Sequence, residues 1–269
     1  MLLDKKRVAR QFNRHVSTYD NYAVVQKHMA HHMMQTLSER DVRVERILEI
    51  GCGTGYLTQL LAERYPSAAI TAVDLAENMV KAARDRLGHE ATVHFLIGDA
   101  ETMEWDETFD LIISNATVQW FGAPEHSFRA LIDHLQPGGW IVFSTFGPDT
   151  FQELHQQFRE VERALRLPSG MHGLRLRRPE EWERILRYAG LTDVGSMVRW
   201  HRLEYPDCYA FLQSIKQTGA SYSASSAAPL SVQRSLLHEV VRRYNQVYRS
   251  KYGVYATYHL VQVWGRKGG

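Results

Sequence analysis

The order of apolar segments in this 269-residue sequence predicts an α/β fold, with a seven-stranded, mostly parallel sheet and helices on both of its faces. Strand and helix patterns alternate from residue 45 to residue 146, which is typical of parallel strands joined by crossover helices. A glycine-rich turn follows the first strand, and the next two strands each end in an aspartate. These observations predict a binding site at the ends of the strands.

The strands are inferred from short apolar runs and the helices from apolar residues that recur at helical spacing. Strands are expected at residues 47–50, 69–74, 93–99, 109–116, 140–146, 194–203 and 255–264. Helices are expected at residues 57–64, 76–87, 127–135, 149–167, 179–190, 206–216 and 231–249, with a further long helix after residue 22. The turn Pro137-Gly138-Gly139 should stop the chain sharply before the fifth strand.

A single domain is expected to span residues 1–269. Residues 1–44 would form helices that cap the core, and residues 45–146 would form the cofactor-binding core. Two insertions, 147–178 and 205–252, would lie beyond the strand ends as a helical lid on the substrate side. The small-residue run at 221–228 is interpreted as a loop within the second insertion.

The three glycines after Glu49 have the spacing of a loop against which a ligand can lie, because glycine has no Cβ. A triphosphate-binding loop would need Lys and then Ser or Thr after the last glycine, but Tyr56 follows Gly55. A dinucleotide loop would place its third glycine one residue later, at position 56. The G-x-G-x-G pattern after an acid favours another nucleoside cofactor, and a tight turn without ligand is the structural alternative.

Two aspartates support a nucleoside site. Asp74 ends the second strand about 20 residues after the glycines, where a carboxylate can accept hydrogen bonds from both ribose hydroxyls. Asp99 ends the third strand, and the fourth strand ends near Asn115. The ends of the first four strands thus carry the glycine loop, Asp74, Asp99 and Asn115 in the order expected for a nucleoside site. This agreement reduces the chance that the glycine turn has only a structural role.

The composition indicates a folded protein in a reducing compartment. Hydrophobic residues make up 44% of the sequence, which is enough for a full core. The N-terminus lacks an apolar signal segment, no run approaches the about 20 apolar residues of a membrane span, and Cys52 and Cys208 are too few for a disulfide framework. A cytoplasmic protein that does not bind a membrane is expected.

The net charge of +2 is unevenly distributed. Residues 1–145 contain 14 Lys and Arg against 19 Asp and Glu, whereas residues 146–269 contain 18 against 11. The basic second part indicates an acidic partner, which could be a nucleic acid, an anionic protein or a small carboxylate. An ordinary solvated surface is the alternative interpretation.

Several further motifs lie at residues 12–22, 114–120, 135–139, 143–154, 212–220 and 257–260. Together with the G-x-G-x-G loop, they resemble the malonyl-acyl-carrier-protein O-methyltransferases of biotin biosynthesis. That family belongs to the class I S-adenosylmethionine-dependent methyltransferases, whose fold is Rossmann-like, and the resemblance is nearly end to end. The sequence departs from the family at Gln217, where a small residue is usual, and at residues 221–228, which replace a more polar loop.

The resemblance implies methyl transfer from S-adenosylmethionine to the free carboxylate of a malonyl thioester, which leaves S-adenosylhomocysteine. No general base is required, because a carboxyl group with a pKa near about 4 is already ionised at neutral pH. Alignment of the carboxylate oxygen, methyl carbon and sulfonium can lower a barrier by up to about 7–11 kcal/mol. The implied partner is malonyl-acyl-carrier protein, an acidic protein that would dock on the basic second part, and coenzyme A as the carrier stays open.

The resemblance also implies roles for individual residues. The glycines would approach the methionine part of the cofactor, Asp74 the ribose, and Asp99 the adenine. The catalytic residues would be Tyr19, ahead of the first helix and over the sulfonium, and Asn115, near the methyl group. For Tyr19, a packed aromatic residue is the alternative. The full expected cofactor-binding set is Glu49, Gly51, Gly53, Gly55, Asp74, Leu75, Met79, Asp99, Ala100, Asn115 and Trp120.

The substrate carboxylate needs a cation, because a buried anion without a partner is costly, and a guanidinium offers a bidentate match. The candidates are Arg175, Arg178, Arg199 and Lys216, each of which could instead be a surface charge. His28 and His32 have i, i+4 spacing, but no third ligand is nearby in the sequence, so no metal site is expected.

Three other functions are considered. Methylation of a small free acid, as in trans-aconitate methyltransferases, needs no carrier protein and shares the Asn-Ala-x-x-Gln-Trp segment at residues 115–120. The basic second part and the long insertions favour a protein-bound substrate. Nucleic-acid methylation would predict an Asn-Pro-Pro-aromatic site after the fourth strand, which the sequence lacks, so no nucleic-acid partner is expected. A binding protein without catalysis is disfavoured by the intact loop and strand-end residues.

Overall fold

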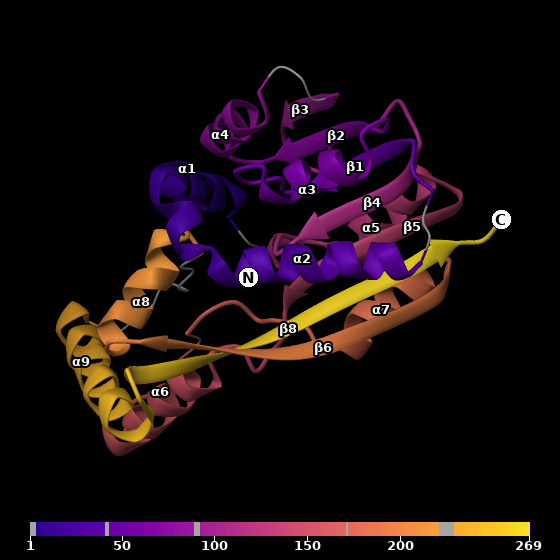
Figure 1. The fold of residues 1–269 in the computed structure, drawn as a ribbon. Helices are drawn as coiled ribbons and strands as arrows, with labels where there is room; N and C mark the ends of the chain where they lie inside the picture. The colour runs from indigo at the N-terminus through magenta and orange to yellow at the C-terminus, as the bar shows by residue number, and fades with distance from the viewer. Residues whose placement is uncertain (1–3, 41–42, 89–91, 171, 221–228) are drawn as a thin grey trace.

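A computed structural model of the chain describes residues 4–40, 43–88, 92–170, 172–220 and 229–269. Over these residues one sheet forms the centre of the molecule, with the strand order β3-β2-β1-β4-β5-β8-β6 and a short β7 paired to β8 (Figure 1). The strands are β1 Arg46–Ile50, β2 Ala69–Asp74, β3 Val93–Ile97, β4 Phe109–Asn115, β5 Leu135–Phe146, β6 Leu191–Tyr205, β7 Arg249–Ser250 and β8 Gly253–Lys267. Strands β1 to β5 are parallel, and β8 is antiparallel to both β5 and β6. The expected mostly parallel sheet is confirmed.

Helices cover both faces of the sheet (Figure 1). They are α1 Lys5–Tyr22, α2 Val24–Glu39, α3 Tyr56–Arg64, α4 Glu77–Leu87, α5 Pro124–Asp133, α6 Gln152–Ala164, α7 Pro179–Tyr188, α8 Cys208–Gln217 and α9 Leu230–Val247, with a short 3-10 helix η1 at Val118–Trp120. None of the helices in the described part of the chain is long and apolar enough to cross a membrane.

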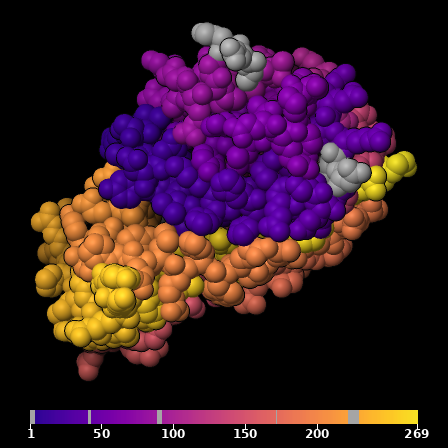
Figure 2. Space-filling model, in the orientation of Figure 1, coloured from indigo at the N-terminus to yellow at the C-terminus, as the bar shows by residue number. Residues whose placement is uncertain are grey.

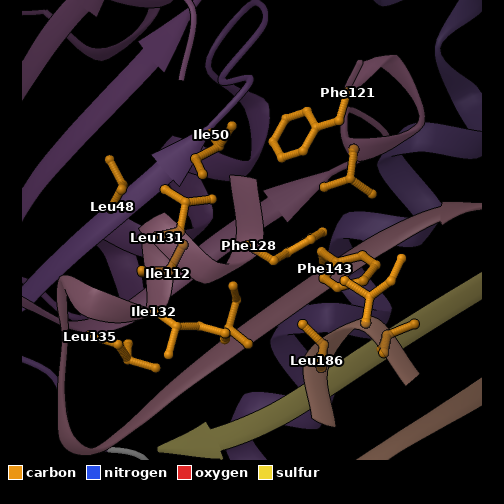
Figure 3. Packing of buried hydrophobic residues seen from close by; sticks show 14 of the residues in the cluster. Leu48, Ile50, Ile112, Phe121, Phe128, Leu131, Ile132, Leu135, Phe143 and Leu186 are labelled. Atoms are coloured by element: carbon orange, nitrogen blue, oxygen red, sulfur yellow. The ribbon is translucent and has the colours of Figure 1, made fainter. Parts of the chain in front are cut away.

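The two faces are separated by the alternation of side chains along each strand. On β1, Ile47 packs in the cluster formed with α2, α3 and α4, and its neighbour Leu48 packs in the cluster formed with α5 and α7. Figure 3 shows the second cluster, in which Phe128 of α5 lies beside Phe143 of β5. The ring centroids of these two phenylalanines are 5.0 Å apart. Both faces of the sheet are therefore buried, which explains why its central strands are continuous apolar runs.

Three elements differ from the sequence expectation. Helix α1 begins at Lys5, so Tyr19 lies in its last turns and not ahead of the first helix. Helix α6 begins only at Gln152, because Phe151 takes a left-handed conformation (φ 59°) that no helix can include. The Pro-Gly-Gly turn does not precede the fifth strand but lies within it, because β5 begins at Leu135. The turn produces a shift in the register between β5 and β4. Gly139 is required there, because a Cβ would lie 2.9 Å from the carbonyl oxygen of Gln136.

The long strands β6 and β8 extend beyond the rest of the sheet and meet α6, α8 and α9 at their far end (Figure 1). These three helices share a separate apolar cluster with β8, which includes Leu154, Phe211 and Tyr244. They come from the two segments expected as insertions, 147–178 and 205–252. The space-filling view shows the indigo N-terminal helices between the purple strand region and the orange and yellow C-terminal part (Figure 2).

Replacing Phe128 by alanine tests the packing of the α5 and α7 face. The ring is 1% exposed and contacts Phe143 and Trp182, so Phe128→Ala should lower the free energy of unfolding by about 3–5 kcal/mol. Chemical denaturation measures this loss. The control is Tyr188→Ala on α7, which is 83% exposed and should change stability by no more than about 0.5 kcal/mol. Equal losses in the two variants would contradict the packing described.

Candidate active site

Two adjoining cavities lie at the carboxyl ends of the parallel strands. The first cavity, with an empty volume of about 880 Å³, is bounded by the ends of β1, β2 and β4 and by α1. The second cavity, of about 1500 Å³, is bounded by α1, α6 and α8. Five residues line both cavities and form their junction: Gln26, Gln119, Trp120, Phe146 and Ala220. A side pocket of about 380 Å³ adjoins the first cavity beside Glu49.

The glycine loop forms the floor of the first cavity, and its three glycines are needed for different reasons. All three have positive φ, at 76° for Gly51, 54° for Gly53 and 82° for Gly55. A Cβ on Gly51 would lie 2.0 Å from the Thr117 hydroxyl, whereas one on Gly53 would meet only open space. A Cβ on Gly55 would meet Ala83 of α4 at 3.0 Å. Gly51 and Gly53 line the first cavity, and Gly55 serves the close packing of α3 on α4.

Asp74 closes the loop from the end of β2. Its carboxylate accepts hydrogen bonds from the backbone N–H of Gly53 at 2.9 Å and of Ala76 at 2.8 Å. Burial raises the pKa of this carboxyl group, and the backbone N–H groups of Ala76, Gly53 and Leu75 act in the opposite direction. Asp74, Leu75 and Met79, which belong to the predicted cofactor-binding set, all line the first cavity.

Glu49 lies in the side pocket and is 1% exposed. Burial raises the pKa of its carboxyl group to about 8; the Thr58 hydroxyl lowers this pKa, and the Asp74 carboxylate raises it further. The oxygen Oε2 has no hydrogen-bond partner among the described residues. A cationic group placed in the side pocket would satisfy this oxygen and favour the ionised carboxylate.

Asp99 lines the first cavity but is bound by a lysine that the sequence reasoning did not identify. Both carboxylate oxygens of Asp99 lie 2.6 Å from Nζ of Lys5, in the first turn of α1. Lys5 also forms an ion pair with Glu101. Burial alone would raise the pKa of Glu101, but hydrogen bonds from Lys5, Ser127 and the Gly122 and Ala123 backbone leave it lowered. Lys5 therefore uses part of the hydrogen-bonding capacity of the Asp99 carboxylate, which also lines the first cavity.

Tyr19 lines the first cavity and the side pocket from the C-terminal part of α1. Burial raises the pKa of its phenol, and the carboxylates of Asp74 and Asp20 add to this effect, so the group stays neutral. The ring meets Phe12 edge to face at 6.3 Å, and Phe12 meets Trp120 in the same way at 5.8 Å. An aromatic wall therefore runs along the cavity from Tyr19 to the junction.

Asn115, at the end of β4, lines the first cavity and the side pocket. Its side-chain amide donates to the carbonyl oxygen of Gln26 at 2.9 Å, and its oxygen accepts from the Ser144 hydroxyl. Nearby, the Gln119 amide donates to the Ala116 carbonyl oxygen at 2.7 Å and accepts from Thr145 at 2.9 Å. Both amides are thus held in fixed orientations beside the cavities.

The four cations expected to meet a substrate carboxylate lie elsewhere. None of them is among the described residues that line the first or second cavity. Arg175, Arg178 and Lys216 are exposed, and Arg199 lines a separate small pocket with His32. The second cavity instead contains Arg7, His155 and His172.

The histidine pair at i, i+4 spacing does not form part of a metal cluster in the described ranges. No group of three suitable ligands occurs there. His28 lies near His201, with ring centroids 4.8 Å apart. Burial lowers the pKa of His201, and the neighbouring histidines His28 and His32 lower it further.

Apart from Tyr19, the residues of α1 that line the cavities were not identified from the sequence. Lys5, Val8 and Phe12 line the first cavity, and Arg7 and Gln11 line the second. The spacing of Val8, Phe12 and Tyr19 fits one face of a helix, so helical periodicity in residues 5–22 was the signal available. Which cavity each α1 residue meets depends on how the helix lies across the strand ends.

Comparisons with known proteins place this geometry in a class. Residues 47–139 match a family model described as a methyltransferase domain. A solved structure of Haemonchus contortus phosphoethanolamine N-methyltransferase 2, in complex with S-adenosyl-L-methionine, has a TM-score of 0.58 and 17% identity, over 96% of this chain and 57% of that chain. The chain therefore has the class I methyltransferase fold, with its cavities at the strand ends.

Closer relatives show the family. The malonyl-acyl-carrier-protein O-methyltransferase of Brevibacillus brevis is 38% identical over 267 residues, which cover 97% of this chain and 96% of that protein. The protein of the same name from Priestia megaterium is 38% identical over 268 residues, covering 97% of both chains. This chain belongs to the malonyl-acyl-carrier-protein O-methyltransferase family.

The buried carboxyl group of Glu49 should make stability depend on pH. In the unfolded chain the group titrates near 4.5, and in the folded chain near 8. Between these values the folded chain holds a proton that the unfolded chain has released, so the free energy of unfolding falls as pH rises. The slope approaches about 1.4 kcal/mol per pH unit.

The variant Glu49→Gln cannot titrate, so its free energy of unfolding relative to the parent should rise steadily from pH 5 to pH 8. Urea denaturation across this range, without added ligand, measures the difference. The exposed control Glu104→Gln should show no such trend. A constant difference for Glu49→Gln would mean that the group is ionised in the folded protein.

Proposed function

We propose that this chain transfers a methyl group from S-adenosylmethionine to the free carboxylate of a malonyl thioester carried on an acyl-carrier protein, at the start of biotin synthesis. One structural observation supports this proposal independently of the family name. The first cavity, lined by Asp74 and Asp99, opens at Gln119 and Trp120 into a second cavity that no Asp or Glu lines among the described residues. The two cavities suit a cationic donor and an anionic acceptor.

The residues of the first cavity fit the donor. Asp74 would bind the ribose, and Asp99 with Ala100 would hold the adenine. The methionine part would lie over Gly51 and Gly53, with its ammonium group near Oε2 of Glu49, which has no hydrogen-bond partner in the described part of the chain. When bound, the donor supplies a methyl group on a positively charged sulfur.

The chain would act by positioning and exclusion of water. A malonate carboxylate is ionised at neutral pH, so no residue has to remove a proton. The polar side chains of the first cavity agree with a reaction that needs no base. Gln119 and Asn115 are amides, and burial keeps the Tyr19 phenol neutral. The aromatic wall would keep water from the reacting atoms, and alignment of oxygen, carbon and sulfur would lower the barrier.

The lining of the second cavity favours a carried acceptor over a small free acid such as trans-aconitate. It includes the apolar side chains of Phe151, Leu154 and Phe158. An apolar cavity of this kind suits the pantetheine arm of a thioester. We retain methylation of a free acid as the alternative that the assay below separates.

The acidic carrier would dock around the mouth of the second cavity, in the cytoplasm. Exposed cations flank residues of its lining: Arg159 follows Phe158, Arg175 lies between Leu174 and Leu176, and Lys216 follows Ile215. Helices α6 and α8 would thus serve both as a lid over the acceptor and as part of the docking surface. Complementary charge of this type raises the association rate.

The direct test incubates the purified protein with methyl-labelled S-adenosylmethionine and malonyl-carrier protein. Label should appear in a base-labile ester on the carrier. The parallel reactions contain malonyl-coenzyme A, malonate or trans-aconitate. If label appears only in the free acids, the alternative function replaces the proposal. If no acceptor is labelled although the donor still binds, the chain is a binding protein without catalysis.

Charge reversal tests the docking surface separately from the chemistry. Lys216→Glu and Arg175→Glu should each lower kcat/KM for malonyl-carrier protein by about 3- to 10-fold, because they place like charge against an acidic partner. The same variants should keep the parent's kcat/KM for a malonyl thioester of free pantetheine. Arg46→Glu, at the exposed start of β1 and away from the cavities, is the matched control. If kcat/KM fell equally for malonyl-carrier protein and for the pantetheine thioester, these residues would have no specific role in docking the carrier protein.

A further inference from the structure

We infer that Gln119 binds the acceptor carboxylate through one N–H of its side-chain amide, and that Thr145 positions this amide. The inference rests on the proposed function and deepens it. Gln119 lies in η1, shortly after the end of β4, and its side chain lines both the first and the second cavity. It therefore lies where an acceptor in the second cavity has to meet the methyl group of a donor in the first.

Two hydrogen bonds fix the orientation of the Gln119 amide. Nε2 donates to the carbonyl oxygen of Ala116 at 2.7 Å, and Oε1 accepts from the hydroxyl of Thr145 at 2.9 Å. A carbonyl oxygen can only accept, so the amide nitrogen lies on the Ala116 side and the amide oxygen faces Thr145 of β5. The second N–H of Nε2 has no acceptor among the described residues, and it is the donor that remains for a ligand.

The partners of this amide are themselves held in place. Thr145 is fully buried, so its hydroxyl cannot turn to water. Ala116 has φ 51°, a strained conformation for a residue with a Cβ, and such strain is found mainly at functional sites. Gln26 also lines both cavities, but its side-chain amide has no hydrogen bond in the described part of the chain. Only the Gln119 amide is therefore preorganised at the junction.

A neutral donor suits this reaction better than a cation. During the transfer a carboxylate oxygen forms a bond to the methyl carbon and the carbon–sulfur bond breaks, while its electron pair stays on sulfur and no proton moves. The negative charge of the acceptor and the positive charge of the donor both disappear. A lysine or arginine held against the carboxylate would therefore stabilise the reactants more than the transition state.

The lining of the cavities agrees with a neutral donor. The four cations predicted from the sequence line neither of the two cavities, and Arg7, which lines the second, already has an interaction within the chain. An amide N–H orients the carboxylate, and the sulfonium of the donor supplies the opposite charge.

The first test removes the N–H of Gln119. Gln119→Glu keeps the shape of the side chain but places like charge against the carboxylate, so kcat/KM for malonyl-carrier protein should fall by about 100-fold. Gln119→Leu should lower it by about 10-fold, mainly through KM, because the hydrogen bond is made to the ionised reactant. The control Gln59→Glu, the same exchange at an exposed position of α3, should match the parent. Calorimetry should show that each variant still binds S-adenosylmethionine, which verifies the fold and the first cavity.

Two substitutions of Thr145 separate its positioning role from packing. Thr145→Val keeps the shape of the side chain and removes the hydroxyl, so kcat/KM for malonyl-carrier protein should fall by about 3- to 10-fold. Thr145→Ser keeps the hydroxyl and should stay close to the parent. In the Gln119→Leu background, Thr145→Val should have little further effect, because the two residues act as one unit. If valine were tolerated better than serine, the buried side chain would serve only packing, and the positioning role would be wrong.

An uncharged acceptor separates recognition of charge from general damage. The analogue is a carrier protein whose malonyl carboxylate is replaced by a carboxamide. Gln119→Glu should lose affinity for malonyl-carrier protein but keep its affinity for the analogue, because a carboxamide can donate to the new carboxylate. Unchanged kcat/KM in both Gln119 variants, or an equal loss of affinity for the two acceptors, would overturn the assignment and leave the proposed methyl transfer intact. Failure of the parent protein to methylate any malonyl thioester would instead overturn the proposed function, and the assignment of Gln119 with it.

Discussion

Asp20 holds the first helix against the glycine loop, and the shape of both cavities depends on this contact. Its carboxylate accepts a hydrogen bond from the Thr54 hydroxyl at 2.7 Å and forms an ion pair with Arg86 of α4. Its carbonyl oxygen accepts from Lys27 of α2 at 2.8 Å. One residue thus joins α1 to the loop, to α4 and to α2. Because the groups are partly buried, loss of one partner leaves the others uncompensated, which is more costly than at an exposed surface.

The remaining geometry of the site follows from how parallel strands end. Their carboxyl ends meet at one edge of the sheet, so residues that are far apart in the sequence come together without long loops. Asp74 uses this proximity to bind the backbone of Gly53, and Asn115 uses it to bind α2 through the carbonyl oxygen of Gln26. Several polar groups at this edge therefore have a structural partner and a free side that faces the cavity.

The parts of the fold that could be predicted from the sequence are those set by local pattern. The buried strands β1, β2 and β4 are continuous apolar runs because helices cover both faces of the sheet, and this signal needs no tertiary information. The glycine spacing and the strand-end acids located the first cavity for a similar reason. Even there, the role of Gly55 was not visible, because its contact with Ala83 joins two helices that the sequence separates.

The acceptor side was predicted less well, because it depends on packing between distant segments. The basic composition of the second half suggested that the carboxylate partner would come from that half. In the structure, Arg7, from the start of the chain, lines the second cavity, whereas Arg175 and Lys216 are exposed. Charge counts report where cations occur along a chain, and only the course of α1 across the strand ends shows which of them enters a cavity.

The long strands β6 and β8 give the protein a form of modularity. Their far ends carry α6, α8 and α9, which share an apolar cluster distinct from the two that flank the central strands. Substitutions inside that cluster can remodel the wall of the second cavity without altering the glycine loop of the first. A scaffold built in this way can acquire new acceptors over evolution while it keeps one methyl source.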